Sequence, residues 1–96
     1  MMMHLANFVR YNARMRPDAI AVRAGSEALT YRQLDRRAAG CAAALRNLGV
    51  RAGDRALFVL PNSLRWVVLY QGIMQAGATP VPVNPLLAGR ELAGII

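Results

Sequence analysis

The sequence contains no lysine, and it has only one histidine, one cysteine and five acidic residues among 96 positions. Without lysine, the chain cannot supply the phosphate-binding lysine of a Walker motif or the amine of a Schiff base. The single histidine and the single cysteine cannot form a tetrahedral metal site alone, and the acidic residues show no ligand spacing. We therefore predict no metal-binding residue. The residues concerned are His4, Asp18, Glu27, Asp35, Cys41, Asp54 and Glu91.

The lone cysteine also excludes an internal disulfide, which favours a reducing compartment and predicts a cytoplasmic location. Long apolar runs are missing too. The most apolar stretch, residues 64–76, is interrupted by Arg65, Gln71 and Gln75, so the sequence predicts no transmembrane segment.

Positive charge is abundant but dispersed. Twelve arginines give a formal net charge of +7, which would favour nucleic acid or an anionic membrane if it lay on one face. The longest arginine run is Arg36-Arg37, and no aromatic residues are interleaved as stacking platforms. We interpret the arginines as a solvated surface and predict no nucleic-acid partner.

The chain is short and unusually apolar. Its length allows one domain at most. Apolar residues make up about 60% when Gly is counted and Tyr is not, against about 45–50% in typical soluble domains. A chain of this size buries only about 60–70% of its unfolded surface, so we expect apolar area to face outward unless something covers it.

The first half of the chain predicts a helix, a hairpin and a second helix. Residues 1–16 contain three arginines and no acid, as a mitochondrial presequence does, but lack the serines typical of one. Their apolar residues recur near helical spacing, so we expect an amphipathic helix that Pro17 ends. Alternating residues around Gly25-Ser26-Glu27 then predict two short strands.

A capping box predicts the start of the second helix. Thr30 and Gln33 have the spacing at which each side chain bonds the other residue's amide, so this helix should begin at Tyr31. Gly49 should end it. Its apolar stripe is expected at Leu34, Ala38, Cys41, Ala42, Leu45 and Leu48.

The second half predicts alternating strands and helices. Residues 56–60 are apolar on both faces, which is typical of a central parallel strand covered by helices on both sides. A helix over 64–76, capped near Ser63 and ended by Gly77, leads to a strand over 79–83. Residues 90–96 resemble the start of a helix that is cut off. The predicted fold class is α/β, a partial layered sheet with helices packed on it.

These residues carry a resemblance to the acyl-adenylate-forming, or AMP-binding, superfamily. The Leu29-Thr30-Tyr31-Arg32-Gln33-Leu34 segment is similar to that superfamily's first motif, and residues 74–85 are similar to its second. Residues 48–55 and 60–63 fall where those enzymes carry a similar loop and strand end. The match covers about Leu5 to Ile96, and its ending resembles most the fatty or medium-chain acyl-CoA synthetases. The resemblance implies that residues 1–96 are an incomplete N-terminal portion of an adenylate-forming domain.

The family activates a carboxylic acid with ATP and Mg²⁺ to an acyl-adenylate and then forms a thioester with coenzyme A. That chemistry needs a phosphate-cradling loop, acidic groups for ribose and metal, and a lysine. All of these lie beyond this chain in the family. We therefore assign no catalytic, cofactor-binding or metal-binding residue, and expect the isolated chain to be inactive, with no cofactor bound. ATP, Mg²⁺ and coenzyme A are implied for the full-length enzyme, with a role in fatty-acid and lipid metabolism.

Five residues whose side chains could carry chemistry are better explained by structure. Cys41 lies on an apolar stripe and should pack as a small buried hydrophobe. Trp66 and Tyr70, four apart, should pack together. Asn62 and Asn84 follow strand ends and fit turns.

Two functional classes follow. The favoured one is an N-terminal fragment of an acid–CoA ligase, whose partner is the remainder of the ligase domain. The alternative is a stand-alone interaction module that binds another protein through an exposed sheet edge or apolar patch.

Overall fold

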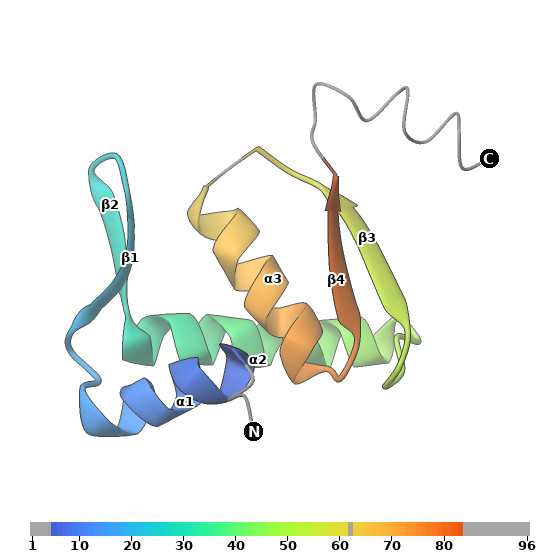
Figure 1. Cartoon of the computed structure of the whole chain (residues 1–96), viewed down its shortest axis with the longest axis horizontal. Coiled ribbons are helices and arrows are strands. Elements are labelled where there is room, and N and C mark those ends of the chain that lie inside the picture. Colours follow the sequence, from blue (N-terminus) through green and yellow to red (C-terminus); the bar gives the residue numbers. More distant parts are fainter. Residues whose placement is uncertain (1–4, 62, 84–96) are drawn as a thin grey trace.

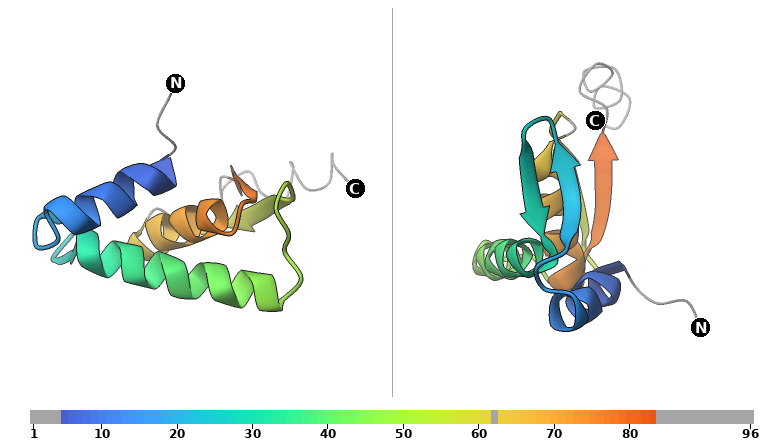
Figure 2. Two further views of the ribbon diagram at one scale, coloured as in Figure 1. Left: turned by 90° about the horizontal axis from the view of Figure 1, so that it is seen from below. Right: turned by 90° about the vertical axis from the view of Figure 1, so that its left-hand side faces the viewer.

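The computed structural model describes residues 5–61 and 63–83, which form three helices and four strands in two small sheets (Figure 1). The long helix α2 forms the base, and α3 lies obliquely across it, between a hairpin on one side and a parallel strand pair on the other (Figures 1 and 2). The elements in order are α1 (Leu5–Met15), β1 (Ile20–Ala24), β2 (Glu27–Thr30), α2 (Tyr31–Asn47), β3 (Arg55–Val59), α3 (Leu64–Gln75) and β4 (Thr79–Val83).

The predicted first half is confirmed element by element. Helix α1 ends at Met15, just before Pro17. Strands β1 and β2 pair antiparallel around the two-residue turn Gly25-Ser26, with a register irregularity between Ile20 and Val22. This hairpin is a separate two-stranded sheet that projects from the helices (Figure 1).

The capping box of α2 forms as the sequence predicts. The Gln33 amide donates to Thr30 Oγ1 at 3.2 Å, and the Thr30 amide donates to Gln33 Oε1 at 2.9 Å. At the other end, Gly49 has a φ of 100°, the left-handed conformation that glycine adopts without a steric penalty. The local sequence therefore fixes both ends of α2.

The second half forms a β-α-β unit. Strands β3 and β4 pair in parallel, with Arg55 opposite Thr79 and Val59 opposite Val83. Helix α3 connects them, and Ser63 caps it by accepting a hydrogen bond from the Trp66 amide at 3.2 Å. The parallel pairing and the cap agree with the sequence-based prediction.

The main core lies where helices α1, α2 and α3 meet the hairpin. Val9 of α1, Leu29 of β2, Leu34 of α2 and Leu64 of α3 are each at most 9% exposed and form one cluster. These residues come from four different elements, so the cluster fixes the hairpin against all three helices.

Two expectations about burial are wrong. Strand β3 is not covered on both faces: its burial alternates, and Leu57 and Val59 are 46% and 39% exposed. Within the described residues β3 pairs with β4 alone, and no element packs over its second face. Leu48 is 82% exposed instead of lying on the apolar stripe, because it is the C-cap of α2 and lies beyond the helix's last turn. The predicted helix start at 90–96 lies outside the described residues.

Candidate functional site

Three of the described carboxylates, those of Asp18, Asp35 and Asp54, make structural contacts. Asp54 accepts a hydrogen bond from the Arg51 amide at 2.8 Å, and Asp18 pairs with Arg32 at 3.3 Å on the surface. Asp35 accepts from the Gln75 side chain at 3.4 Å, joining α2 to α3. Across residues 5–61 and 63–83, no three His, Cys, Asp or Glu side chains gather where they could hold a metal ion.

Cys41 is a packing residue at the crossing of α2 and α3, as its place on the stripe predicts. Its thiol is partly buried, and burial raises the pKa of the Cys41 thiol, which disfavours the nucleophilic thiolate. The opposite residue is Gly72, where an added Cβ would lie 2.7 Å from both Cβ and Sγ of Cys41. The two helices therefore approach closely because position 72 has no side chain.

The aromatic pair predicted from spacing is formed. The Trp66 and Tyr70 rings are stacked, with centroids 5.1 Å apart and planes 15° apart. Phe58 of β3 meets Trp66 edge to face at 5.8 Å. These contacts attach the strand pair to α3, so packing accounts for both aromatic residues. Asn62 and Asn84 lie outside the described residues.

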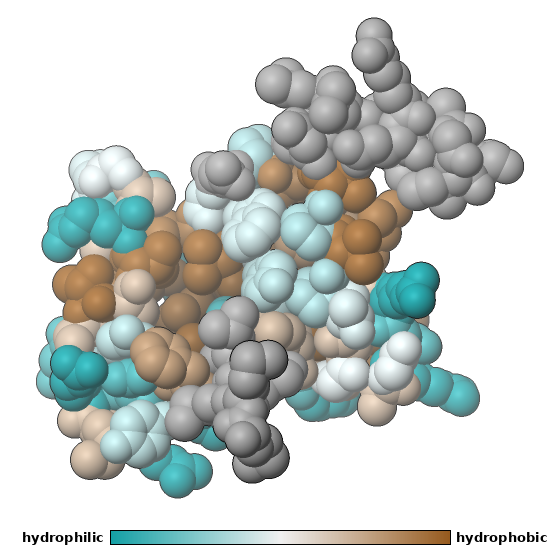
Figure 3. Space-filling view, viewed as in Figure 1, coloured by the Kyte–Doolittle hydropathy of each residue, from teal (hydrophilic) through white to brown (hydrophobic). Residues whose placement is uncertain are grey.

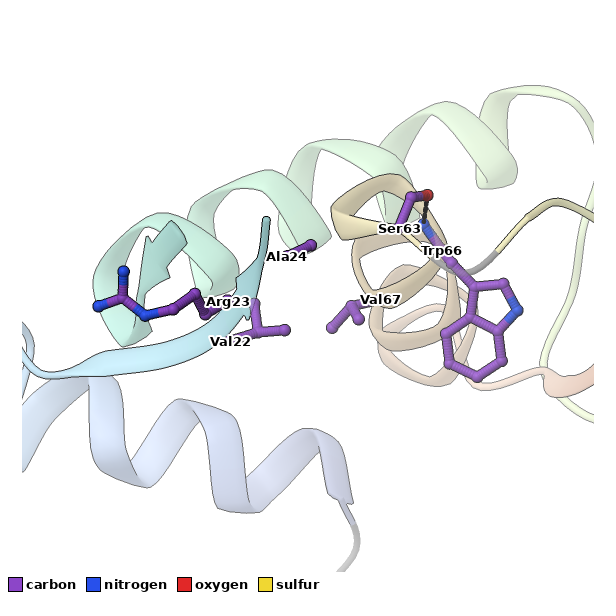
Figure 4. A pocket seen from close by; sticks show the side chains of 6 residues that line it. All are labelled: Val22, Arg23, Ala24, Ser63, Trp66 and Val67. Carbon is purple, nitrogen blue, oxygen red and sulfur yellow. Dashed lines mark hydrogen bonds between the residues drawn. The ribbon is translucent and has the colours of Figure 1, made fainter. Parts of the chain in front are cut away.

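A first hollow of about 320 Å³ separates β1 from the start of α3 (Figure 4). Val22 and Val67 face one another across it, whereas Arg23 points away from it (Figure 4). Apolar surface fills the same region between the hairpin and α3 (Figure 3). The residues that line this first hollow are Val22, Arg23, Ala24, Ser63, Trp66 and Val67.

A second hollow of about 430 Å³ lies beside the crossing of α2 and α3. Arg37 and Arg65 contribute positive charge to it and Glu27 contributes negative charge, so its lining is mixed. Cys41 and four apolar residues, Leu60, Leu64, Val68 and Leu69, line the rest. No hydrogen bond joins the Glu27 carboxylate to the Cys41 thiol, so the described lining of this hollow shows no nucleophile paired with a base.

A third feature is the uncovered face of the strand pair. Leu57 and Val59 are exposed there, and apolar surface continues over the ends of β3 and β4 (Figure 3). Contiguous exposed apolar side chains are a feature of interaction surfaces. Sequence reasoning predicted outward apolar area from composition but could not place the hollows, because each depends on how distant segments pack.

Sequence reasoning also missed a buried polar group on α3. Gln71 is 8% exposed, and among residues 5–61 and 63–83 its Oε1 atom has no hydrogen-bond partner. A glutamine in an apolar helix gives no sequence signal for this. A buried acceptor without a donor is costly and is uncommon in complete folds.

Comparison with known proteins shows which protein family contains this arrangement of helices and strands. The family described as "AMP-binding enzyme" matches residues 9–96. Feruloyl-CoA synthase of an Amycolatopsis species is 48% identical over 80 residues, which cover 83% of this chain and 16% of the synthase. The long-chain-fatty-acid–CoA ligase FadD13 of Mycobacterium tuberculosis is 38% identical over 68 residues, covering 71% of this chain and 14% of the ligase.

Solved structures agree with the sequence comparison. The anthranilate–CoA ligase AuaEII, in complex with anthranoyl-AMP, superposes with a TM-score of 0.85 at 30% identity. The match covers 97% of this chain and 18% of that ligase. The chain thus spans about one sixth of the length of the relatives that it matches.

Proposed function

This chain belongs to the AMP-binding enzyme family, and from that premise we propose that it forms the N-terminal portion of an ATP-dependent acid–CoA ligase. The observation that carries the proposal is the extent of the match: over four fifths of this chain aligns with one sixth of a CoA ligase at 48% identity. In such an enzyme these residues would form part of the structural framework of the ligase domain, and the rest of that domain would pack against them.

The described residues have the properties of a scaffold. Their polar contacts cap helices and join neighbouring elements, as at Thr30, Ser63 and Asp54. Acyl-adenylate formation requires a phosphate cradle, a cation and acidic metal ligands. No described cluster fits Mg²⁺, and the chain has no lysine. We therefore assign no step with ATP, Mg²⁺ or coenzyme A to these residues, and propose that the chain alone has no ligase activity.

The carboxylic acid that the proposed ligase activates can be determined with a panel of candidate substrates. Relatives include a synthase named for feruloyl-CoA and a ligase named for long-chain fatty acids. The first has the higher identity, so aromatic acids are the first to test, with fatty acids second. A role in fatty-acid metabolism and a cytoplasmic location remain predictions.

The alternative function is a small interaction module. The observation favouring it is the uncovered apolar face at Leu57 and Val59, together with the hollow beside Val22 and Val67. A second protein could cover these surfaces as well as the remainder of a ligase could.

Acid-dependent release of AMP from ATP, with thioester formation, tests the proposal. The longest product of the gene should convert at least one aromatic or fatty acid to its CoA thioester, while residues 1–96 alone should convert none. Absence of any polypeptide longer than this chain, or a longer one inactive with every acid, would contradict the ligase proposal. Activity of the isolated chain would contradict the scaffold role.

A further inference from the structure

Helix α1 exposes three large apolar side chains in one row. Phe8, Tyr11 and Met15 are each between 45% and 63% exposed. Their spacing of three and then four residues places them on one line along the helix, about 10 Å long. Val9 lies on a different side of α1, where it is buried in the core cluster. The exposed row is therefore a second apolar face of α1, left open among residues 5–61 and 63–83.

A row of positive charge runs beside this apolar row. Arg10 and Arg14 are exposed and lie four residues apart, so they share one side of α1, and Arg14 is a neighbour of Tyr11 three residues before it. The helix dipole favours Arg14 in the last turn, but it does not reach Arg10 in the middle of the helix. Together these residues form the outer surface of α1: Phe8, Arg10, Tyr11, Arg14 and Met15.

The two arginines have no negative partner in the described part of the chain. Neither forms an ion pair among residues 5–61 and 63–83, and no acidic residue precedes Asp18 in the sequence. Like charges four residues apart on a helix repel one another. A negatively charged partner would remove this repulsion.

The outer surface of α1 lies apart from the other open surfaces of the molecule. Helix α1 packs beside α2, at the end of the molecule opposite the parallel strand pair (Figures 1 and 2). Phe8 meets Tyr31 at the start of α2 edge to face, with ring centroids 6.4 Å apart. One flank of the apolar row thus borders the protein itself, and the other flank borders the arginines.

These features indicate a helix as the partner. The backbone groups in the middle of α1 are bonded within the helix, so α1 offers no edge to an added strand, and a partner has to bind through side chains. An amphipathic helix does so by laying its own apolar row, with residues three and four apart, along the facing row. Acidic side chains beside that apolar row would meet Arg10 and Arg14.

Two other occupants fit this surface less well. A second copy of the chain would bring no negative charge, because the outer surface of α1 contains no acidic residue. A helix that lies in a bilayer surface turns its whole apolar face to the lipid. The apolar residues of α1 are divided instead, since Val9 is buried in the core while Phe8, Tyr11 and Met15 face outward.

We propose that the outer surface of α1 binds an acidic amphipathic helix of another protein. The apolar row supplies the contact area, and the arginines orient the partner and speed its association. This inference goes beyond the proposed function, because it assigns a partner to a surface far from the strand pair.

Binding of a designed peptide to the longest product of the gene tests the proposal. The probe is a helical peptide of about 18 residues, with leucines three and four apart and glutamates beside them, and its control carries lysines in place of the glutamates. We expect the glutamate peptide to bind at least about 10-fold more tightly than the lysine peptide, with a difference that shrinks at high salt. Equal binding of the two peptides, or no binding of the glutamate peptide, would overturn the proposal.

Variants of α1 make the test specific to this surface. Tyr11→Ser combined with Met15→Ser should weaken binding of the glutamate peptide at least about 10-fold, because it removes apolar contact area. Arg10→Glu combined with Arg14→Glu should reverse the preference, so that the lysine peptide binds more tightly. All four side chains are exposed, so the fold should persist. If a variant does not fold, the comparison of the two peptides on the unmodified protein still decides.

A matched control separates this surface from net charge. Arg55→Glu combined with Arg65→Glu changes the net charge by the same amount on β3 and α3, where both arginines are exposed. This variant should still prefer the glutamate peptide. A reversal equal to that of the α1 variant would overturn the proposal, because net charge alone would then explain the preference.

Oxidation of Met15 by hydrogen peroxide identifies the occupant of the surface. In the longest product, Met15 should form its sulfoxide as fast as an exposed methionine, and the bound glutamate peptide should slow this reaction. Slow oxidation without the peptide would overturn the proposal, since the enzyme itself would cover the surface. A rate that falls as protein concentration rises would overturn it in favour of a second copy. Protection by phosphatidylglycerol vesicles and not by the peptide would overturn it in favour of a lipid surface.

Discussion

Replacing Gly72 by alanine should destabilise the fold, although alanine is the better helix former. The new Cβ would lie 2.7 Å from Cβ and Sγ of Cys41 and 3.2 Å from the Ala38 carbonyl oxygen. Carbon atoms pack at about 3.5–4.0 Å, so α2 and α3 would have to separate by about 1 Å. The Cys41 Cβ and a carbonyl cannot rotate out of the way, which places the cost near the upper end of the roughly 1–3 kcal/mol typical of overpacking.

The gain in helix propensity offsets part of this cost. Alanine is favoured over glycine by about 1 kcal/mol inside a helix, so the net loss should be about 2 kcal/mol. Gly40 is the matched control, because it lies in α2 and an added Cβ there would meet no atom within 4 Å other than its neighbours and its own helix backbone. Gly40→Ala should therefore stabilise the fold by about 1 kcal/mol through propensity alone.

Urea unfolding of residues 1–96 measures both variants. Trp66, the only tryptophan, lies on α3 and stacks on Tyr70, so its fluorescence reports the packing of this helix. Circular dichroism reports the helix content. The free energy of unfolding follows from linear extrapolation. Stabilisation by Gly72→Ala equal to that of Gly40→Ala would refute the close approach at Cys41.

Three further predictions concern single side chains. Thr30→Ala should lower the free energy of unfolding by about 1 kcal/mol in urea melts because it removes the cap of α2, and Thr30→Ser should restore most of it; equal melts for all three chains would contradict the capping role. Arg46→Ala should cost about 0.5–1 kcal/mol in the same assay, since its guanidinium donates to the Gln75 carbonyl at 2.8 Å, whereas an equal loss from exposed Arg36→Ala would show that the loss does not come from this hydrogen bond. Burial raises the pKa of the Cys41 thiol. The contribution of the protonated thiol to the free energy of unfolding is therefore complete below the ordinary thiol pKa and is lost as the pH rises through the folded-state pKa. Urea melts across that range should show this loss in the native chain and not in Cys41→Ala, and a parallel decline in both would refute it.

Local signals in the sequence account for most of the elements. The Thr30–Gln33 box, the Ser63 cap and the glycine after α2 each act through neighbouring residues, so their positions could be predicted closely. The pairing of β3 with β4 followed from the strand-helix-strand order alone.

What the sequence could not reveal depends on contacts between distant segments. The apolar run at residues 56–60 predicted a strand covered on both faces. Apolar residues show that a strand can pack against other elements, but they do not show whether such elements lie beside it, and the burial of β3 alternates. The hollow between Val22 and Val67 and the unpaired Gln71 Oε1 exist because of how β1 and α3 pack. That no residue of this chain takes part in catalysis stays a prediction.

Helix α3 contacts α1, α2, both hairpin strands and β4, whereas no other helix makes comparable contact with the strand pair in the described part of the chain. The hairpin side is thus anchored by a cluster from four elements, and the strand pair is anchored through one. Local opening should therefore begin at β3 and β4, below the temperature at which the hairpin and the helices unfold together. During synthesis the reverse order follows: the first fifty or so residues can condense around Leu34 early, and the parallel pair waits until α3 has emerged to carry it.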